Sequence, residues 1–310
     1  MESPATRRAR PVAFETAEGL RLRGEWWDAA GPPVLLAHGF GQTRQSWAAT
    51  QARLAAEGFG SLAMDARGHG QSDRNPKGLL YEGVQFVNDA VRAAATLPAA
   101  PILVGASMGG LTGLMAQAQS GCFRALVLVD VTPRWEEAGM ARIHAFLRAH
   151  PEGFEDYEHA AEAIASYLPH RRGRKTRDQL EPLLRADHDG RLQWHWDLRM
   201  LEEFVVGSAA LQSRIEAAAS EVRVPVLLVS GGRSDLVSDR TVAHFRELVP
   251  QAHHVRLPEA THMVAGDDND GFTDSVLGFL RAQSHLPPAL PARIPGGHAA
   301  VAAPESGVTR

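Results

Sequence analysis

The sequence predicts an α/β fold: a mostly parallel, eight-stranded sheet with helices on both faces and an inserted helical cap. Short apolar segments alternate with longer segments of helical periodicity along most of the 310 residues. The strand-like segments are apolar on both faces, which is typical of sheets covered by helices on both sides. The alternation breaks once, from residue 134 to residue 207, where the chain is charged, helix-like and rich in Trp and Tyr.

The elements follow in order along the chain. Two extended segments, "VAFETAEG" and "LRLRGEWW", predict a hairpin that turns near Glu18 and Gly19. The predicted core strands after it are "PVLLAHGF", "GSLAMD", "APILVGAS", "FRALVLVDV", "VPVLLVSGG" and "AHHVRLPE". The predicted helices between and after them are "SWAATQARLAAEGF", residues 81–97, "MGGLTGLMAQAQSG", "DRTVAHFRELVP" and "GFTDSVLGFLRAQ".

Composition divides the chain into a core, a cap and two ends. We expect residues 11–133 and 208–283 to form the α/β core, and residues 134–207 to form the helical cap. Residues 1–10 are expected to be a flexible N-terminus. The tail, 284–310, is rich in Pro, Ala and Gly without apolar periodicity, so we expect it to be disordered.

Composition also excludes several classes of partner. The net charge of −4 argues against a nucleic-acid surface, which carries a basic excess. No apolar run is long enough to span a membrane, and the N-terminus has no apolar segment typical of a secretory signal. A single cysteine, Cys122, cannot form an intramolecular disulfide, which is compatible with a cytoplasmic location. Homo-oligomer formation stays open.

A lone serine stands where a predicted strand meets a predicted helix. Residues 105–109, "GASMG", follow the G-x-S-x-G pattern. In this setting the chain makes a sharp turn, which requires small neighbours and exposes the serine hydroxyl in a cleft. Ser107 is therefore the predicted nucleophile.

A serine hydroxyl needs a base to act as a nucleophile, and the base needs an acid to orient it. On this type of sheet the expected chain order is Ser, then Asp or Glu, then His. Asp235 and His262 each follow a predicted strand, so both are expected at the edge of the sheet where Ser107 lies. Asp130, at the end of an earlier strand, is the rival acid. The backbone N–H groups of Phe40 and Met108 are the predicted donors to an oxyanion.

At this point the motifs resemble those of a known family. "LAHGF", "MDARGHGQSD", "GASMGG", "SGGRSDLV" and "ATHMV" occur in the order and at the spacing typical of the α/β-hydrolase superfamily. The sequence is similar to its capped esterase, lactonase and cofactor-free haloperoxidase-like branch. The resemblance implies catalytic Ser107, Asp235 and His262 beneath a helical cap, with no metal and no organic cofactor. Epoxide hydrolases and haloalkane dehalogenases of this fold use an aspartate where this chain has serine, so those reactions are disfavoured.

The predicted function is that of a serine hydrolase acting through an acyl-enzyme on Ser107. The expected partner is a small-molecule carboxylic ester or lactone of small to medium size and apolar character. Cofactor-free perhydrolysis, seen as haloperoxidase activity, and cleavage of a thioester, an amide or a carbon–carbon bond would use the same residues. A non-catalytic ligand receptor on a hydrolase scaffold is the alternative from another class.

Two groups of residues are expected to line the substrate pocket. One adjoins the predicted catalytic positions, namely His38, Leu236 and Met263. The other comes from the cap, namely Trp135, Trp194 and Trp196. The aromatic residues of the cap could equally form the cap's own core.

Other conspicuous groups are interpreted as structural. Asp65, Arg67 and His69 in "DARGHGQSD" are expected to form a hydrogen-bonded loop at the rim of the cleft. The acidic run at 267–270 lacks calcium-loop spacing and is expected to begin the last helix. The basic run at 171–175 is expected to be a solvated loop of the cap.

Overall fold

The computed structural model describes residues 9–167, 173–203, 208–267 and 269–283. Eight strands form one sheet in the order β1-β2-β4-β3-β5-β6-β9-β10. The strands are β1 (Arg10–Glu15), β2 (Arg21–Trp27), β3 (Val34–Ala37), β4 (Ser61–Met64), β5 (Ile102–Ala106), β6 (Ala125–Val129), β9 (Val226–Gly231) and β10 (Ala252–Leu257). The pairs β1–β2 and β2–β4 are antiparallel and all others are parallel, which confirms the predicted sheet and its N-terminal hairpin.

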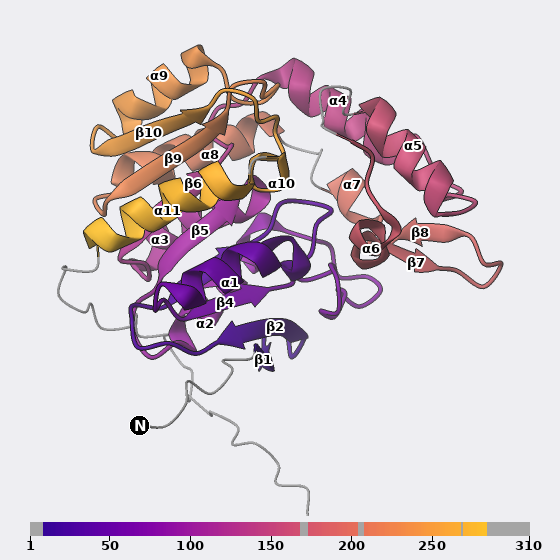
Figure 1. Ribbon diagram of the computed structural model, residues 1–310, viewed down its shortest axis with the longest axis horizontal. Helices are drawn as coiled ribbons and strands as arrows, with labels where there is room; N and C mark the ends of the chain where they lie inside the picture. The colour runs from indigo at the N-terminus through magenta and orange to yellow at the C-terminus, as the bar shows by residue number, and fades with distance from the viewer. Residues whose placement is uncertain (1–8, 168–172, 204–207, 268, 284–310) are drawn as a thin grey trace, which may run out of the picture.

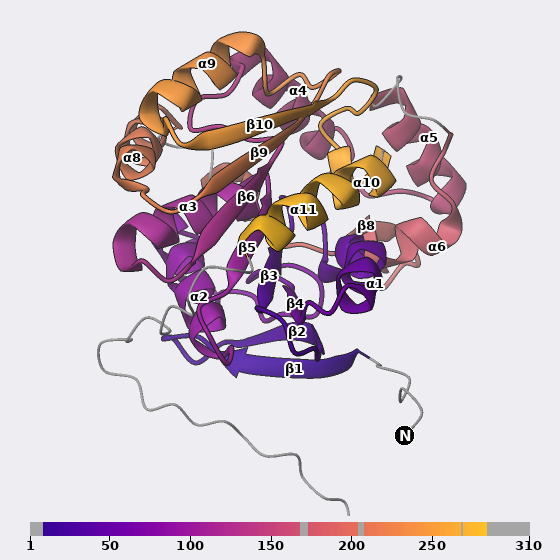
Figure 2. The same cartoon turned by 60° about the vertical axis from the view of Figure 1, so that its left-hand side comes forward.

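Helices cover both faces of the sheet (Figure 2). On one face lie α1 (Ala48–Ala56), preceded by the 3-10 turn η1 (Arg44–Trp47), and α11 (Asn269–Gln283), preceded by the short α10 (Val264–Asp267). On the other face lie α2 (Gly83–Ala95), α3 (Met108–Ser120), α8 (Ser208–Glu221) and α9 (Asp239–Leu248). The prediction of helices on both faces is therefore confirmed.

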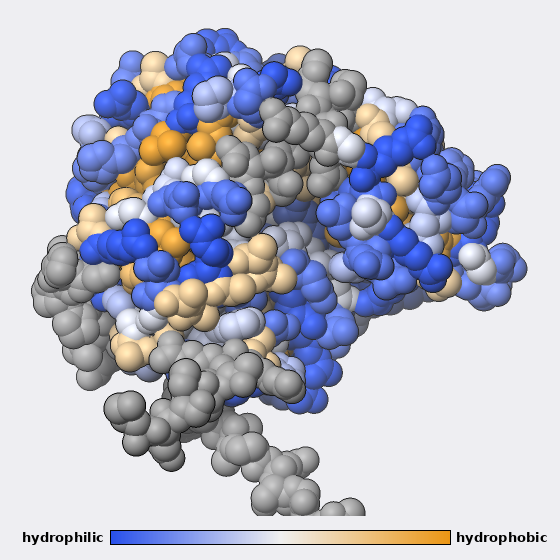
Figure 3. All heavy atoms as spheres, viewed as in Figure 1, coloured by the Kyte–Doolittle hydropathy of each residue, from blue (hydrophilic) through white to orange (hydrophobic). Residues whose placement is uncertain are grey.

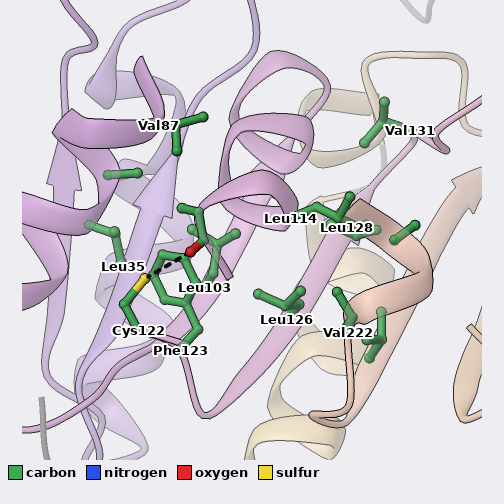
Figure 4. Packing of buried hydrophobic residues seen from close by; sticks show 14 of the residues in the cluster. Leu35, Val87, Leu103, Leu114, Cys122, Phe123, Leu126, Leu128, Val131 and Val222 are labelled. Atoms are coloured by element: carbon green, nitrogen blue, oxygen red, sulfur yellow. Dashed lines mark hydrogen bonds between the residues drawn. The ribbon is translucent and has the colours of Figure 1, made fainter. Parts of the chain in front are cut away.

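Two apolar cores follow from the alternation of side chains along each strand. On β5, Leu103 belongs to the core beneath α3, and the next residue, Val104, belongs to the core beneath α11. Figure 4 shows the first of these cores, to which Leu114 of α3 and Leu126 and Leu128 of β6 all belong. Each fully buried Leu or Val contributes about 1.5–3 kcal/mol. Cys122 lies in the same core, and burial raises the pKa of its thiol to about 11, so it is a packing residue.

Residues 134–207, which we call the insertion, come between β6 and β9. Its described elements are α4 (Glu137–Arg148), α5 (Tyr157–Tyr167), α6 (Arg177–Leu180), η2 (Glu181–Leu183), β7 (Leu184–Ala186), β8 (Leu192–Trp194) and α7 (Met200–Glu203). Figure 1 shows the insertion at the right, standing out from the sheet. Figure 3 shows that its outer surface is mostly hydrophilic, while Phe154, Leu180 and Trp194 are buried inside it. The small β7–β8 hairpin was not predicted.

Some of the predictions made for the ends of the chain and for its loops concern residues that the structure does not describe. Outside the described parts lie residues 1–8 of the expected flexible N-terminus, 171–172 of the basic run, 268 of the acidic run and the whole expected tail, 284–310. Among the helices that are described, none is both long enough and apolar enough to cross a lipid bilayer.

Candidate active site

Ser107 lies in a tight turn between β5 and α3. Its φ of 46° and ψ of −113° are sparsely populated for a residue with a Cβ. The turn brings the backbone of α3 so close that a Cβ on Gly105 would lie 2.6 Å from the carbonyl oxygen of Gly109. A Cβ on Gly109 would lie 2.4 Å from the carbonyl oxygen of Ala37 on β3. The glycines of the motif are thus required by contacts on both sides of the serine.

Asp130 and His262 form a hydrogen-bonded pair at the ends of two other strands. His262 lies in the loop after β10, and its Nδ1 donates to Asp130 Oδ2 at 2.7 Å. Asp130, which follows β6, is fully buried and also accepts hydrogen bonds from Ser234 Oγ at 2.6 Å and from the Gly231 N–H at 2.8 Å. These donors hold the carboxylate in one orientation. Since the bond to Asp130 fixes the proton on Nδ1, the Nε2 of His262 is left as an acceptor.

Backbone strain marks Ser107 and Asp130. Among the described residues other than glycine, only Ser107 and Asp130 have a positive φ, of 46° and 48°. Such conformations cost on the order of 1–3 kcal/mol each and cluster at functional sites. Both strained residues directly follow a strand of the parallel sheet, so the strain aims their side chains at the shared edge.

The expectation that Asp235 orients His262 is wrong for this geometry. Asp235 follows β9, one strand further along the sheet, and its carboxylate forms an ion pair with Arg142 Nη1 of α4 at 3.2 Å. Its side chain is 26% exposed, whereas that of Asp130 is fully buried. His262 Nδ1 has only one proton to donate, and Asp130 accepts it. The rival acid is therefore the one that the structure pairs with the histidine.

The loop after β3 brings the Phe40 backbone to the serine. A Cβ on Gly39 would lie 3.5 Å from the Cβ of Ser107, so the two turns are in contact. The carbonyl oxygen of Gly39 accepts a hydrogen bond from His38 Nδ1 at 2.8 Å and another from the Gln42 N–H at 3.1 Å. In a planar trans peptide the N–H points away from the C=O, so these bonds also set the direction of the Phe40 N–H.

A cavity of about 310 Å³ lies over this edge of the sheet. Its lining includes residues predicted for the site, namely Ser107, Met108, Phe40, His262 and Met263. The cavity wall is otherwise mostly apolar and is completed by the insertion, including the three predicted tryptophans, Trp135, Trp194 and Trp196. Trp194 and Trp196 also pack in the insertion's own core, so the two alternative interpretations of these side chains both hold.

Two residues predicted to line the pocket do not. His38 is buried and makes both of its hydrogen bonds to backbone, and Leu236 is packed in the core beneath α9. From α4 the wall takes Phe146, one of the aromatic residues of the cap that were expected at the pocket, and also Met140 and Ile143, which were not predicted. The spacing of three residues from Met140 to Ile143 to Phe146 was the available signal, because it places apolar side chains on one side of the helix.

The loop that holds Asp65, Arg67 and His69 is hydrogen-bonded, as expected. Asp65, Arg67 and His69 are fully buried and none of them lines the cavity. Arg67 donates to both carboxylate oxygens of Asp89, at 2.7 and 2.8 Å. Asp65 accepts the backbone N–H of Arg44 at 2.8 Å, so it anchors the start of η1.

The described residues contain one cluster of potential metal ligands, Asp187, His188 and Asp189. It lies on the mostly exposed turn between β7 and β8, and none of its members lines the cavity of Ser107. Asp187 Oδ1 accepts the N–H groups of Asp189 and Arg191, both at 3.0 Å, which is the ordinary role of an aspartate in a turn. The cluster is therefore explained by the hairpin.

Comparison with known proteins agrees with this arrangement of fold and site. The Alpha/beta hydrolase family matches residues 34–275. The 3-hydroxybutyrate-oligomer hydrolase of Cupriavidus necator is 31% identical over 260 residues, which cover 77% of this chain and 85% of that protein. The sn-1-specific diacylglycerol lipase ABHD11 of Mus musculus is 27% identical over 285 residues, covering 87% and 85%. The crystal structure of E-2-(acetamidomethylene)succinate hydrolase has a TM-score of 0.75 at 25% identity, covering 88% of this chain and all of that one.

This chain belongs to the Alpha/beta hydrolase family. The similar proteins are hydrolases, and the chain is a hydrolase of the same fold.

Proposed function

We propose that this protein is a serine hydrolase that cleaves a small to medium carboxylic ester or lactone of apolar character. The hydrogen bond from His262 Nδ1 to Asp130 Oδ2, 2.7 Å long at the cavity that Ser107 also lines, carries the proposal. It leaves His262 Nε2 able to accept a proton, which is what a serine hydroxyl requires in order to attack a carbonyl carbon.

In the proposed reaction His262 removes the Ser107 proton as Oγ attacks the substrate carbonyl. Asp130 holds the imidazole in the required tautomer and stabilises the imidazolium. The N–H groups of Phe40 and Met108 donate to the developing oxyanion. Met108 suits this role because it is the first residue of α3, and the first N–H groups of a helix have no acceptor within the helix. Each such donor is worth on the order of 3 kcal/mol in the transition state.

The acyl-enzyme then forms as the carbonyl re-forms and His262 gives its proton to the departing alcohol oxygen. Water then attacks the acyl carbonyl carbon as His262 removes its proton. The carboxylic acid leaves when the bond to Ser107 Oγ breaks and His262 returns the proton to Oγ. No step in this sequence requires a redox change.

The cavity supports an apolar substrate. Its wall includes apolar side chains of α3, of α4 and of the segment at and after the end of β8, such as Leu111, Met140, Trp194 and Trp196. The names of the similar proteins support an ester in particular, since they include a diacylglycerol lipase and a hydrolase of 3-hydroxybutyrate oligomers. A lactone presents the same carbonyl and the same leaving oxygen in one ring.

Ser107→Ala tests the proposal on a panel of chromogenic esters and lactones. We expect kcat/KM to fall at least about 10³-fold, because the remaining groups can only bind and polarise the substrate. Ser120→Ala, at the other end of α3, is the matched control and should retain wild-type turnover. Unchanged turnover of Ser107→Ala, with thermal unfolding unchanged as well, would show that the nucleophile is wrongly assigned.

A further inference from the structure

Three buried imidazoles lie side by side next to the loop that follows β3. His38 and His69 belong to the core, and His195 comes from the insertion, one residue after β8. Their ring centroids are 5.1 Å apart for His38 and His69, and 5.9 Å apart for His69 and His195. None of the three lines the cavity, so the mechanism above does not use them directly.

Each ring bonds one backbone N–H and one backbone C=O. His38 Nε2 accepts from the Ala66 N–H at 3.0 Å, while its Nδ1 bonds the Gly39 carbonyl. His69 Nε2 accepts from the Gly41 N–H at 3.2 Å, while its Nδ1 bonds the Arg67 carbonyl at 3.1 Å.

His195 completes the pattern with the opposite tautomer. Its Nδ1 accepts from the Gly70 N–H at 2.8 Å, and its Nε2 donates to the Gly41 carbonyl at 3.2 Å. An N–H can only donate, so all three rings must be neutral to make these bonds. Burial has the same consequence, since it lowers the pKa of all three imidazoles, that of His195 to about 4.

Two of these rings form hydrogen bonds to the same residue, Gly41, in the loop after β3. Gly41 has its N–H held by His69 of the core and its C=O held by His195 of the insertion. Phe40 packs edge-on against Trp196 and against His69, with centroid distances of 4.9 and 5.4 Å. Because Gly41 directly follows Phe40, any displacement of its peptide groups also turns the Phe40 backbone.

The insertion is fixed to the core at the place from which His195 projects. Arg74 Nη2 donates to the His195 carbonyl at 3.0 Å, and the Asp197 N–H donates to the Gly68 carbonyl at 2.9 Å. Tyr81 Oη donates to Asp197 Oδ2 at 2.9 Å. The position of the His195 ring therefore depends on the seating of the insertion on the core.

We propose that His195 is a positioning residue through which the insertion holds the Gly39–Gln42 loop, and with it the Phe40 N–H, in the geometry that stabilises the oxyanion. This inference rests on the proposed function, since it assigns a role in the same reaction. The insertion then does more than close the cavity: it completes the reacting site through one imidazole.

The test compares two substitutions of His195 with a control on the same hairpin. His195→Phe keeps a ring and removes both hydrogen bonds. His195→Gln keeps one acceptor and one donor on an amide and can restore both in part. His188→Phe is the control, because the His188 side chain is 87% exposed on the β7–β8 turn. Each variant is assayed for ester hydrolysis, for inhibition by a trifluoromethyl ketone and for thermal unfolding.

A positioning role predicts a split that a purely structural role would not produce. In His195→Phe, kcat should fall about 10-fold with KM within about twofold, because the lost interaction is made in the transition state. Affinity for the ketone, which binds as an oxyanion adduct, should fall in parallel with kcat/KM. His195→Gln should recover most of both, and His188→Phe should match the wild type. Should His195→Phe fail to fold, His195→Asn replaces it, since the shorter amide loses the Gly41 contact.

Labelling by a fluorophosphonate separates the two possible failures. If Ser107 of the wild type is not labelled, the proposed function is wrong, and the inference falls with it. If Ser107 is labelled, but neither kcat nor ketone affinity changes when His195 is replaced, only the inference is overturned. It is overturned also if the losses follow thermal stability and Gln gives no rescue.

Discussion

Replacing Asp130 with Asn distinguishes the two candidate acids most sharply. The Asp130 carboxylate accepts three hydrogen bonds: Oδ1 takes the Gly231 N–H, and Oδ2 takes Ser234 Oγ and His262 Nδ1. An asparagine amide can still accept the Gly231 N–H, but it then presents an NH₂ group to His262. Because two donors cannot bond each other, Nδ1 must lose its proton, and the proton moves to Nε2.

The magnitude follows from that change of tautomer. An imidazole protonated at Nε2 cannot accept the Ser107 proton, so the general base is lost while the fold around it persists. In the serine protease triad the same substitution costs about 10⁴-fold in kcat, or about 5.4 kcal/mol. We expect a loss of that order for Asp130→Asn. Asp235→Asn breaks only a part-exposed ion pair with Arg142, worth about 0.2–1 kcal/mol of stability, and should leave kcat within about twofold.

The assay is steady-state hydrolysis of a chromogenic ester by the two variants, with thermal unfolding of each measured alongside. Both variants change one carboxylate to an amide at the end of a neighbouring strand, so each is the control for the other. The reasoning is refuted if Asp235→Asn collapses the rate and Asp130→Asn does not. It is refuted also if the two fall equally while both remain folded.

The remaining predictions concern stability with pH, the turn at the serine and the cavity. Burial lowers the pKa of His195 from its ordinary 6.5 to about 4, so between these values the unfolded chain binds more protons. The free energy of unfolding should therefore decrease as pH falls from 6.5 towards 4, by up to about 1.4 kcal/mol per pH unit from this group. Urea unfolding measured at several pH values should show that this free energy depends less steeply on pH in His195→Gln than in the wild type. Gly109→Ala should lower stability by about 1–3 kcal/mol and impair turnover, because its Cβ would lie 2.4 Å from the Ala37 carbonyl oxygen. Gly278→Ala, at an exposed position of α11 where a Cβ meets nothing within 4 Å, should do neither. Ile143→Trp, on the wall of the cavity, should shift the preferred ester to a shorter chain, whereas Ala145→Trp on the exposed face of α4 should not.

The order of strands and helices was predictable because local patterns determine it. The buried strands are short apolar runs, and the helix after Ser107 ends at Gly121, which adopts the left-handed conformation that glycine favours. The serine motif could be recognised because close contacts between backbone segments require glycine at two of its positions. The β7–β8 hairpin was missed because its strands have three residues each, too few to show a period.

The acid could not be chosen from the sequence, and the reason is geometric. Asp130 and Asp235 follow strands β6 and β9, which are neighbours in the sheet, so both come to the same edge. Which carboxylate meets His262 depends on the positive φ of Asp130 and on the donors Gly231 and Ser234, which come from a distant part of the chain. Likewise, the contact of His195 with Gly41 joins residues 154 positions apart, with no local signal.

The most direct measurement is peptide mapping by mass spectrometry after reaction with a fluorophosphonate. The account predicts one adduct, on the Ser107 peptide, that forms rapidly in the wild type and far more slowly in Asp130→Asn. An unmodified Ser107 under conditions in which the protein hydrolyses esters, or an adduct on another residue that tracks activity, would contradict it.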